Sequence, residues 1–407
     1  MKCRHCDSTL RCDFLDLGFA PPSNAYLSAE ALSAPELYFP LRLKVCEECW
    51  LVQTEDYASA KSLFSSDYAY FSSASKGWLA HAKRYVEMIT ERLDLNKDSM
   101  VIEIASNDGY LLKNFLAAGI PCLGVEPTHS TADAAEALGI PVAREFFGEF
   151  FASSLVDQGK SADLILGNNV YAHVPDINDF TRGMKLALNA GGTITLEFPH
   201  VMRLIEQNQF DTVYHEHFSY LSLFTVTKIF EGAGLRVFDV EELPTHGGSL
   251  RVYGCHDGDE RDTSTAVHAV LTEEARQGLR GVEVYRTFQK KAEKVKDDVL
   301  AFLLKAKEDG KTVAAYGAAA KGNTLLNFAG VKPDLLPFVC DAVVSKQNKF
   351  MPGSHIPIHH PDELMKNRPD YVMILPWNIA AEVREQLAVL AENGTKFVTA
   401  VPVLSVQ

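Results

Sequence analysis

Side chains able to move a proton are concentrated in residues 211–220, Asp-Thr-Val-Tyr-His-Glu-His-Phe-Ser-Tyr. A histidine titrates near neutral pH, so His215 or His217 can act as a general base. Glu216 or Tyr214 would then orient that base or hold a substrate. Two alternatives stay open, because a His-x-His pair in an extended segment could bind a metal and the segment could be a polar loop without a site. The density of these side chains favours proton transfer.

A second polar group follows a predicted strand. Asn168 and Asn169 come directly after an apolar run, and His173 follows four residues later. Residues at the carboxyl ends of parallel strands face the crevice in which such sheets bind ligands. We therefore expect His173 in a site, with a core histidine as the alternative. Tyr68 and Tyr70, upstream of the first predicted helix, are either packing aromatics or part of a lid that donates hydroxyls.

A cofactor loop is predicted where a buried strand breaks at Glu103. A second apolar run ends at Glu126, 23 residues further on, and an acidic residue at about this distance holds ribose hydroxyls in a doubly wound sheet. Ala105 and Asn107 replace the glycines of a dinucleotide loop, and only Gly109 remains. A pyrophosphate would have less room here, whereas S-adenosylmethionine has no phosphate and suits the tighter turn. An ordinary strand–helix connection is the alternative.

The residues expected to contact this cofactor are Glu103, Ala105, Asn107, Gly109, Tyr110, Leu111, Glu126, Asn168 and Asn169.

Two cysteine pairs at the N-terminus predict a metal site. Cys3-x-x-Cys6 and Cys46-x-x-Cys49 place four thiolates where one tetrahedral zinc can collect them. A redox or disulfide role is the alternative, and we expect His5, inside the first pair, not to be a ligand. Four thiolates leave no open coordination position, so the zinc is expected to be structural.

Composition limits the classes of function. The chain has 407 residues, 47% of them hydrophobic, and a net charge of −14, which argues against non-specific binding to nucleic acid. No apolar run is long enough for a membrane helix, and the N-terminus lacks the apolar region of a signal peptide. We expect a cytoplasmic protein, a monomer, without a nucleic-acid or membrane partner.

The helices and strands that would position these residues indicate an α/β fold. A helix is predicted over 79–94, and strands near 100–105, 121–126, 163–168, 192–198, 235–241 and 249–255. A polar linker and a charged helix over 272–309 follow, and then strands near 312–317, 336–340, 370–375 and 396–400. These patterns predict a small zinc-binding segment at the N-terminus, one α/β unit with a mostly parallel sheet over about 60–255, and a second, smaller sheet beyond residue 312.

The C-terminal domain opens with a second strand–turn–helix unit. Its turn contains Lys321 and Asn323 but not the Lys-Ser/Thr of a P-loop. A lysine and backbone amides at a helix start could bind a diphosphate. A packing turn with a solvated lysine is equally compatible with the spacing.

Taken together, the motifs resemble the nucleotide-sugar C-methyltransferases, which make branched deoxysugars such as tetronitrose, mycarose and noviose. The shared motifs are the cysteine pairs, Glu-x-x-Ser-Asn-Asp-Gly-Tyr-Leu, Asn-x-x-x-His-Val-Pro-Asp, Tyr-His-Glu-His-Phe-Ser-Tyr and Tyr-Gly-Ala-Ala-Ala-Lys-Gly-Asn. They occur in the same order along nearly the whole chain. One departure is Ala105, where the family commonly has glycine.

The resemblance implies an α/β fold of three domains: a zinc-binding domain over 1–60, an S-adenosylmethionine-binding methyltransferase domain with a doubly wound sheet over 61–257, and a Rossmann-like domain over 265–407. It implies that substrate lies between the last two. It implies a catalytic site of Tyr68, His173, Tyr214, Glu216 and His217, with His217 as the base, and substrate contacts from Tyr70, Lys321 and Asn323. The implied partner is a nucleotide-diphosphate 4-keto-deoxysugar, with dTDP as nucleotide, methylated at C3 in preference to C5. An O- or N-methyltransferase and a non-catalytic zinc-dependent binding protein are the alternatives.

Overall fold

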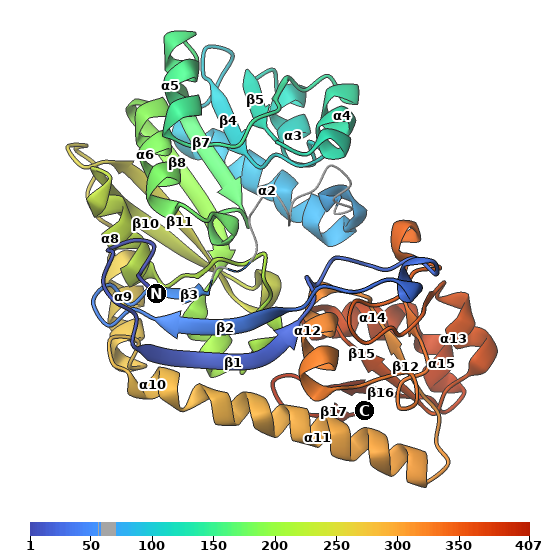
Figure 1. The fold of residues 1–407 in the computed structure, drawn as a ribbon. Helices are drawn as coiled ribbons and strands as arrows, with labels where there is room; N and C mark the ends of the chain where they lie inside the picture. The colour runs from blue at the N-terminus through green and yellow to red at the C-terminus, as the bar shows by residue number, and fades with distance from the viewer. Residues whose placement is uncertain (56, 58–70) are drawn as a thin grey trace.

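The computed structural model describes residues 1–55, 57 and 71–407, which form three sheets surrounded by helices (Figure 1). The central sheet has the strand order β10-β11-β8-β7-β4-β5-β6. β11 runs antiparallel to both β10 and β8, and the other neighbouring strands are parallel to one another. Counted from β4, this is the 3-2-1-4-5 order of a doubly wound sheet followed by a hairpin. Its strands are β4 (Val101–Ile104), β5 (Cys122–Val125), β6 (Val142–Ala143), β7 (Ala162–Asn168), β8 (Leu188–Pro199), β10 (Leu235–Leu243) and β11 (Ser249–His256).

Alternate residues of the central strands face two helical layers. Val101 packs with one layer and Ile102 with the other, as the two-residue period of a strand requires. The first layer contains α2 (Lys76–Leu93), α3 (Leu112–Ala117) and α4 (His129–Ala137), and the second α5 (Glu149–Asp157), α6 (Ile177–Ala187) and α8 (Leu223–Gly232). With both faces covered, a ligand can reach the sheet only at its edges, and the predicted site residues follow the carboxyl ends of β4, β5 and β7.

The C-terminal sheet has the order β14-β13-β12-β15-β16-β17 and is parallel except for β17. Its first five strands again follow the order 3-2-1-4-5, which confirms the Rossmann-like prediction. The elements are β12 (Val313–Tyr316), β13 (Val339–Cys340), β14 (Ile358–His359), β15 (Tyr371–Ile374), β16 (Lys396–Thr399), β17 (Ser405–Val406), α12 (Ala320–Ala329), α13 (Asp362–Asn367), α14 (Ala380–Gln386) and α15 (Ala388–Glu392).

The N-terminal sheet is antiparallel and joins the three parts of the chain. β1 (Cys12–Ala20), β2 (Phe39–Val45) and β3 (Val52–Thr54) are completed by β9 (Ser219–Tyr220), which comes from the end of the histidine-rich segment. On β1, Phe14 packs against Tyr285 and Phe288, with ring centroids 5.5 and 4.9 Å apart. The N-terminal segment is therefore built into the rest of the molecule.

Most predicted elements are present, but the single helix predicted over 272–309 is wrong. The segment instead contains α9 (Thr265–Arg276), α10 (Glu283–Arg286) and α11 (Phe288–Glu308). Gly278, in the left-handed region at φ 83°, follows the end of α9 and explains the break. α11 then runs beneath β1 to the C-terminal sheet (Figure 1). Within the described ranges, no helix is both long and apolar enough to cross a membrane.

The shorter elements are α7 (Val201–Glu206), η1 (Ala31–Ser33), η2 (Ser72–Ala74), η3 (Tyr171–His173), η4 (Phe210–Thr212), η5 (Thr245–Gly247), η6 (Val344–Lys346) and η7 (Trp377–Ile379).

Candidate active site

The predicted cofactor loop follows β4 and turns through three left-handed residues. Ala105, Asn107 and Gly109 have φ values of 56°, 49° and 75°. A Cβ on Gly109 would lie 2.4 Å from Cδ1 of Ile140, so a larger residue there would push the loop away from its support. The loop is tight, as its sequence predicts.

Glu126 ends β5 beside this loop. Its carboxylate accepts hydrogen bonds from the backbone N–H groups of Asn107 (3.0 Å) and Thr128 (2.8 Å). It also lines a cavity of about 640 Å³. A carboxylate has about four acceptor positions, so two backbone donors fix its orientation and leave it able to accept from a ribose.

Six of the predicted cofactor residues line this cavity and three do not. Those that line it are Ala105, Asn107, Tyr110, Glu126, Asn168 and Asn169. Gly109 lies against Ile140 and Ala135, and Leu111 is fully buried. Glu103 is 1% exposed, and burial, helped by the charges of Glu126 and Asp108, raises its pKa well above the usual range. Contact between any of the nine residues and a cofactor stays a prediction.

Two imidazoles meet on another wall of the same cavity. The rings of His173 and His217 have centroids 4.5 Å apart at an angle of 75°, and the Tyr214 ring lies 4.1 Å from that of His217. Nδ1 of His173 donates to the carbonyl oxygen of Glu216 over 2.8 Å. This bond leaves Nε2 of His173 as an acceptor in the neutral ring. The structure therefore brings together the described residues of the predicted catalytic group.

Burial keeps both rings neutral. It lowers the pKa of His173 to about 4. Burial also lowers the pKa of His217 well below its usual range, and the nearby His173, His246 and Lys321 lower it further, whereas a hydrogen bond to the Thr212 backbone opposes the shift. A neutral imidazole is the form that can accept a proton, so each ring can serve as a base at neutral pH.

The Glu216 carboxylate is fixed by a residue distant in the sequence. It is 2% exposed, and both of its oxygens accept hydrogen bonds from Nδ2 of Asn24, at 2.8 and 2.9 Å. Asn24 belongs to the N-terminal segment and lines the cavity with Glu216. The sequence analysis did not single it out, because no local motif marks a partner 192 residues away.

His215 points away from the cavity. Its Nε2 lies 3.3 and 3.2 Å from the carbonyl oxygens of Phe39 and Pro40 on β2. His215 and His217 therefore do not face one side, as a His-x-His metal site requires. Within the part of the chain that the structure describes, the four N-terminal cysteines form the one group of metal-ligand type.

Lys321 reaches the cavity from the start of α12. Nζ donates to Oδ1 of Asn378 over 3.1 Å and lies 4.6 Å from the Trp377 ring centroid. Burial lowers its pKa, and the charge of the buried Asp211 opposes the shift. Among the described side chains, no carboxylate forms an ion pair with Lys321 within 4.0 Å. A half-buried lysine cation that forms no ion pair with a described carboxylate is suited to an anionic ligand.

Asn323 lies elsewhere. It is fully buried, its Nδ2 donates to the carbonyl oxygen of Ser23 over 2.5 Å, and it does not line the cavity. In this arrangement Asn323 ties α12 to the N-terminal segment, and a substrate contact stays a prediction. Tyr68 and Tyr70 lie outside the described residues.

His246 is a site residue that the sequence analysis missed. It lines the cavity from η5 with a left-handed backbone (φ 54°), and its Nε2 lies 2.7 Å from Nδ2 of Asn169, itself left-handed at φ 55°. Strained residues of this kind collect at functional sites. The sequence signal for this turn was the His-Gly-Gly run between two strands. The structure explains the glycine at 247, because a Cβ there would lie 2.5 Å from Trp377.

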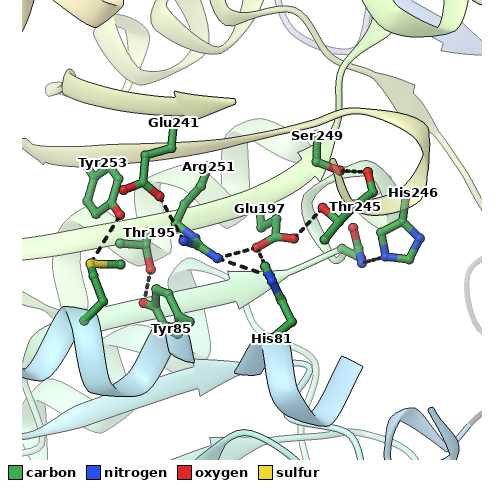
Figure 2. Close-up of polar contacts among 12 residues, drawn as sticks. His81, Tyr85, Thr195, Glu197, Glu241, Thr245, His246, Ser249, Arg251 and Tyr253 are labelled. Atoms are coloured by element: carbon green, nitrogen blue, oxygen red, sulfur yellow. Dashed lines mark hydrogen bonds and ion pairs between the residues drawn. The ribbon is translucent and has the colours of Figure 1, made fainter. Parts of the chain in front are cut away.

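A buried ion network supports η5 (Figure 2). Glu197, at the end of β8, accepts from Arg251 over 2.8 Å, lies 2.9 Å from Nε2 of His81, and accepts from Thr245 over 2.9 Å. Burial alone would raise the pKa of Glu197, but His81 and Arg251 lower it. The carboxylate therefore stays charged and holds the turn that carries His246.

The four cysteines converge at one end of the N-terminal sheet, beside the turn between β2 and β3. Their sulfur atoms lie within 4.8 Å of one another, with Cys3–Cys49 and Cys6–Cys46 at 3.5 Å. Zn–S bonds of about 2.3 Å in a tetrahedron separate sulfurs by about 3.8 Å, so the set fits zinc. His5 instead places Nδ1 2.8 Å from Oδ1 of Asn178, outside the sulfur group.

Comparison with known proteins places this geometry in a family. Three family models match successive segments: one named for a zinc binding domain over residues 3–64, a methyltransferase domain over 78–240, and a C-methyltransferase C-terminal domain over 244–402. The C-methyltransferase NovU of Streptomyces niveus is 34% identical over 401 residues, which cover 98% of this chain and 95% of NovU. The chain belongs to this C-methyltransferase family.

Solved structures of other methyltransferases match part of this S-adenosylmethionine-dependent C-methyltransferase at low identity. A methyltransferase from Clostridium acetobutylicum is 11% identical, with a TM-score of 0.35 over 43% of this chain and 91% of its own. The magnesium protoporphyrin IX methyltransferase of Synechocystis is 13% identical, with a TM-score of 0.33 over 44% of this chain and 80% of its own. The family assignment rests on NovU and the family models.

Proposed function

We propose that this C-methyltransferase acts on a 4-keto deoxysugar linked to a nucleoside diphosphate, with dTDP as the nucleotide and C3 in preference to C5 as the methylated carbon. The observation that carries the proposal is the pair of neutral imidazoles, His173 and His217, in one cavity with Glu126 and the cation of Lys321. A base, a carboxylate for the cofactor ribose and a cation for the diphosphate in one cavity are the groups that C-methylation of a nucleotide sugar would need.

The ketone explains why a base is required. Carbon becomes nucleophilic when a neighbouring ketone lets its proton leave as an enolate, so an enzyme that methylates carbon must first remove that proton. His217 is the proposed base: its neutral ring takes the proton from the carbon and becomes an imidazolium beside the enolate. S-adenosylmethionine supplies the methyl group, which passes from sulfonium to carbon, and the proton on His217 then returns to solvent.

The neighbouring side chains have separate proposed roles. Tyr214, packed on the His217 ring, would donate its hydroxyl to the enolate oxygen. Nε2 of His173, the acceptor nitrogen of the neutral ring, would accept from a sugar hydroxyl. Glu216, held by Asn24, would accept from another hydroxyl. Tyr68 and Tyr70 are proposed to close over the sugar.

The cofactor would lie along the β4 and β5 edge. The Glu126 carboxylate would accept from its ribose, and Asn107, Tyr110 and Asn168 line the space next to it. Burial raises the pKa of Tyr110 well above its usual range, so this phenol stays a hydrogen-bond donor. One structural zinc would be held by Cys3, Cys6, Cys46 and Cys49, outside the reaction cavity.

A substrate panel tests the proposed function. The purified enzyme is incubated with methyl-labelled S-adenosylmethionine and with 4-keto sugars carried on dTDP, UDP or GDP, with the matching 4-hydroxy sugars as controls. Label should enter a carbon–carbon bond of a 4-keto sugar and should be absent from every 4-hydroxy control. Label recovered on oxygen or nitrogen, or transfer to the 4-hydroxy sugars at the same rate, would refute the enolate route.

A further inference from the structure

A second cavity of about 620 Å³ adjoins the first and has no role in the chemistry above. The two share three lining residues, Trp78, His246 and Asn378. Its walls come from α2, from β10 and β11, and from the start of α14. It therefore opens between the central and C-terminal sheets, next to the position where Asn378 accepts from Lys321.

We propose that this second cavity binds the nucleoside of the sugar nucleotide, an inference that rests on the proposed function. The diphosphate links the sugar to the nucleoside, so the two moieties must lie on opposite sides of it. The sugar has to reach His217 in the first cavity, and the diphosphate is proposed to meet Lys321 at the shared wall. The nucleoside then extends away from His217, into the second cavity.

The available volume supports the same arrangement. One ligand pocket in proteins measures roughly 300–1,000 Å³ and encloses one drug-sized molecule. The first cavity, at about 640 Å³, already has to accommodate S-adenosylmethionine and the reacting sugar. The second has nearly the same volume and space for a nucleoside.

The lining suits a base and its ribose. Trp78, at the shared wall, gives the lining an aromatic side chain, and its ring is held by His81 and Tyr110 with centroids 4.9 and 6.1 Å away. Arg84, Glu241 and Glu382 supply donors and acceptors around the cavity. These groups differ from the apolar set expected of a packing void.

The floor of the cavity is rigid. Arg251 is 4% exposed and divides its guanidinium between Glu197 (2.8 Å) and Glu241 (2.9 Å), as Figure 2 shows. Its Nε has no hydrogen-bond partner among the described residues. The ion network thus fixes a wall of the second cavity and the turn of His246 at once, so a nucleoside and a sugar would be positioned by one preorganised unit.

Filling the cavity tests the inference. Gly77, on the α2 wall, has an ordinary backbone, and a Cβ there would meet only Oγ of Ser75 at 3.9 Å, so Gly77→Leu should fold normally. The matched control is Gly258→Leu, where a Cβ meets nothing within 4 Å and which does not line the cavity. A second pair is Ile379→Trp on the opposite wall and Val389→Trp, an exposed residue of α15 away from it.

Calorimetry would measure the affinity of the full chain for dTDP, UDP, inorganic pyrophosphate and S-adenosylmethionine. We expect Gly77→Leu and Ile379→Trp to weaken nucleoside diphosphate binding at least tenfold and to leave pyrophosphate and S-adenosylmethionine unchanged, with both controls like the parent. If both filled variants bind nucleoside diphosphates as tightly as the parent, the second cavity is not the nucleoside site, and the proposed function is unaffected. A parent that binds no nucleoside diphosphate would overturn the proposed function and the inference with it.

Discussion

At the scale of single residues, the site depends on histidines kept neutral by burial. His173 and His217 share one cavity, and Nδ1 of His173 donates to the Glu216 carbonyl, so the proton of that neutral ring lies on Nδ1. An exposed imidazole would be partly protonated near neutral pH and less available as a base. The motif Tyr-His-Glu-His thus acquires its chemistry from its surroundings.

The pH dependence of kcat/KM follows from that burial. Because the pKa of His217 is well below 6.5 in the folded chain, protonation should switch the base off only below that pH. We expect the acidic limb of the kcat/KM profile to have its midpoint below 6.5 and activity to be level between pH 6.5 and 7.5. A midpoint at or above 6.5 would show that the base is solvated or is a different group.

Glu126 gives a second prediction at this scale. Replacing it by alanine removes the proposed ribose contact and the acceptor for two backbone N–H groups. Loss of a charge-assisted bond costs about 1.5–3 kcal/mol, so S-adenosylmethionine should bind about ten- to a hundredfold more weakly by calorimetry. Glu87→Ala, on the exposed face of α2, is the control. Equal affinity in Glu126→Ala and the parent would place the ribose elsewhere.

At the scale of elements, two similar turns build the cysteine cluster. In each pair the carbonyl of the first cysteine accepts a hydrogen bond of 3.0 Å from a left-handed residue four positions on, Asp7 after Cys3 and Trp50 after Cys46. The turns bring four sulfurs together at one end of the N-terminal sheet. Because β9 belongs to that sheet, loss of the cluster should also disturb the histidine-rich segment.

Zinc should therefore be needed for folding before it is needed for chemistry. Elemental analysis should find one zinc per chain in the parent and less than half of that in Cys3→Ser, which should also melt at a lower temperature. The control is Cys122→Ser in β5, which should keep its zinc. Full zinc content in Cys3→Ser, or a parent without zinc, would contradict the assignment of these ligands.

Sequence reasoning succeeded where the information was local. Apolar runs identified β4, β5 and β7, and the spacing of the cysteines identified their cluster. It did not identify the contact of Asn24 with Glu216 or the burial of Asn323 against Ser23, because both depend on how the N-terminal segment crosses the other domains. The role of η5 also depends on packing, since only the folded chain brings Trp377 against Gly247.

At the scale of the whole molecule, the reaction cavity belongs to all three parts of the chain. Asn24 comes from the N-terminal segment, Glu126 and His217 from the central part, and Lys321 from the C-terminal domain. Trp377 joins the last two by donating to Asp211 over 2.7 Å. Binding of the sugar nucleotide should therefore depend on the C-terminal domain, whereas the proposed contacts of the methyl donor come from the central part.

Lys321→Ala tests this division of labour. Without the cation, the KM for the sugar nucleotide should rise about tenfold or more, while calorimetry with S-adenosylmethionine should be unchanged. Lys366→Ala, an exposed lysine of α13, should match the parent in both measurements. An unaltered KM in Lys321→Ala would move the diphosphate away from α12.

The most direct test of the central claim, that His217 generates the enolate, is isotope exchange without methyl transfer. The enzyme is saturated with S-adenosylhomocysteine in deuterated water, and exchange at the carbon next to the ketone of the bound 4-keto sugar is followed by NMR. The parent should exchange this hydrogen, and His217→Asn should lose about 10²–10⁴-fold of the rate while still binding both ligands. Exchange that survives in His217→Asn and disappears in His173→Asn would identify the other imidazole as the base.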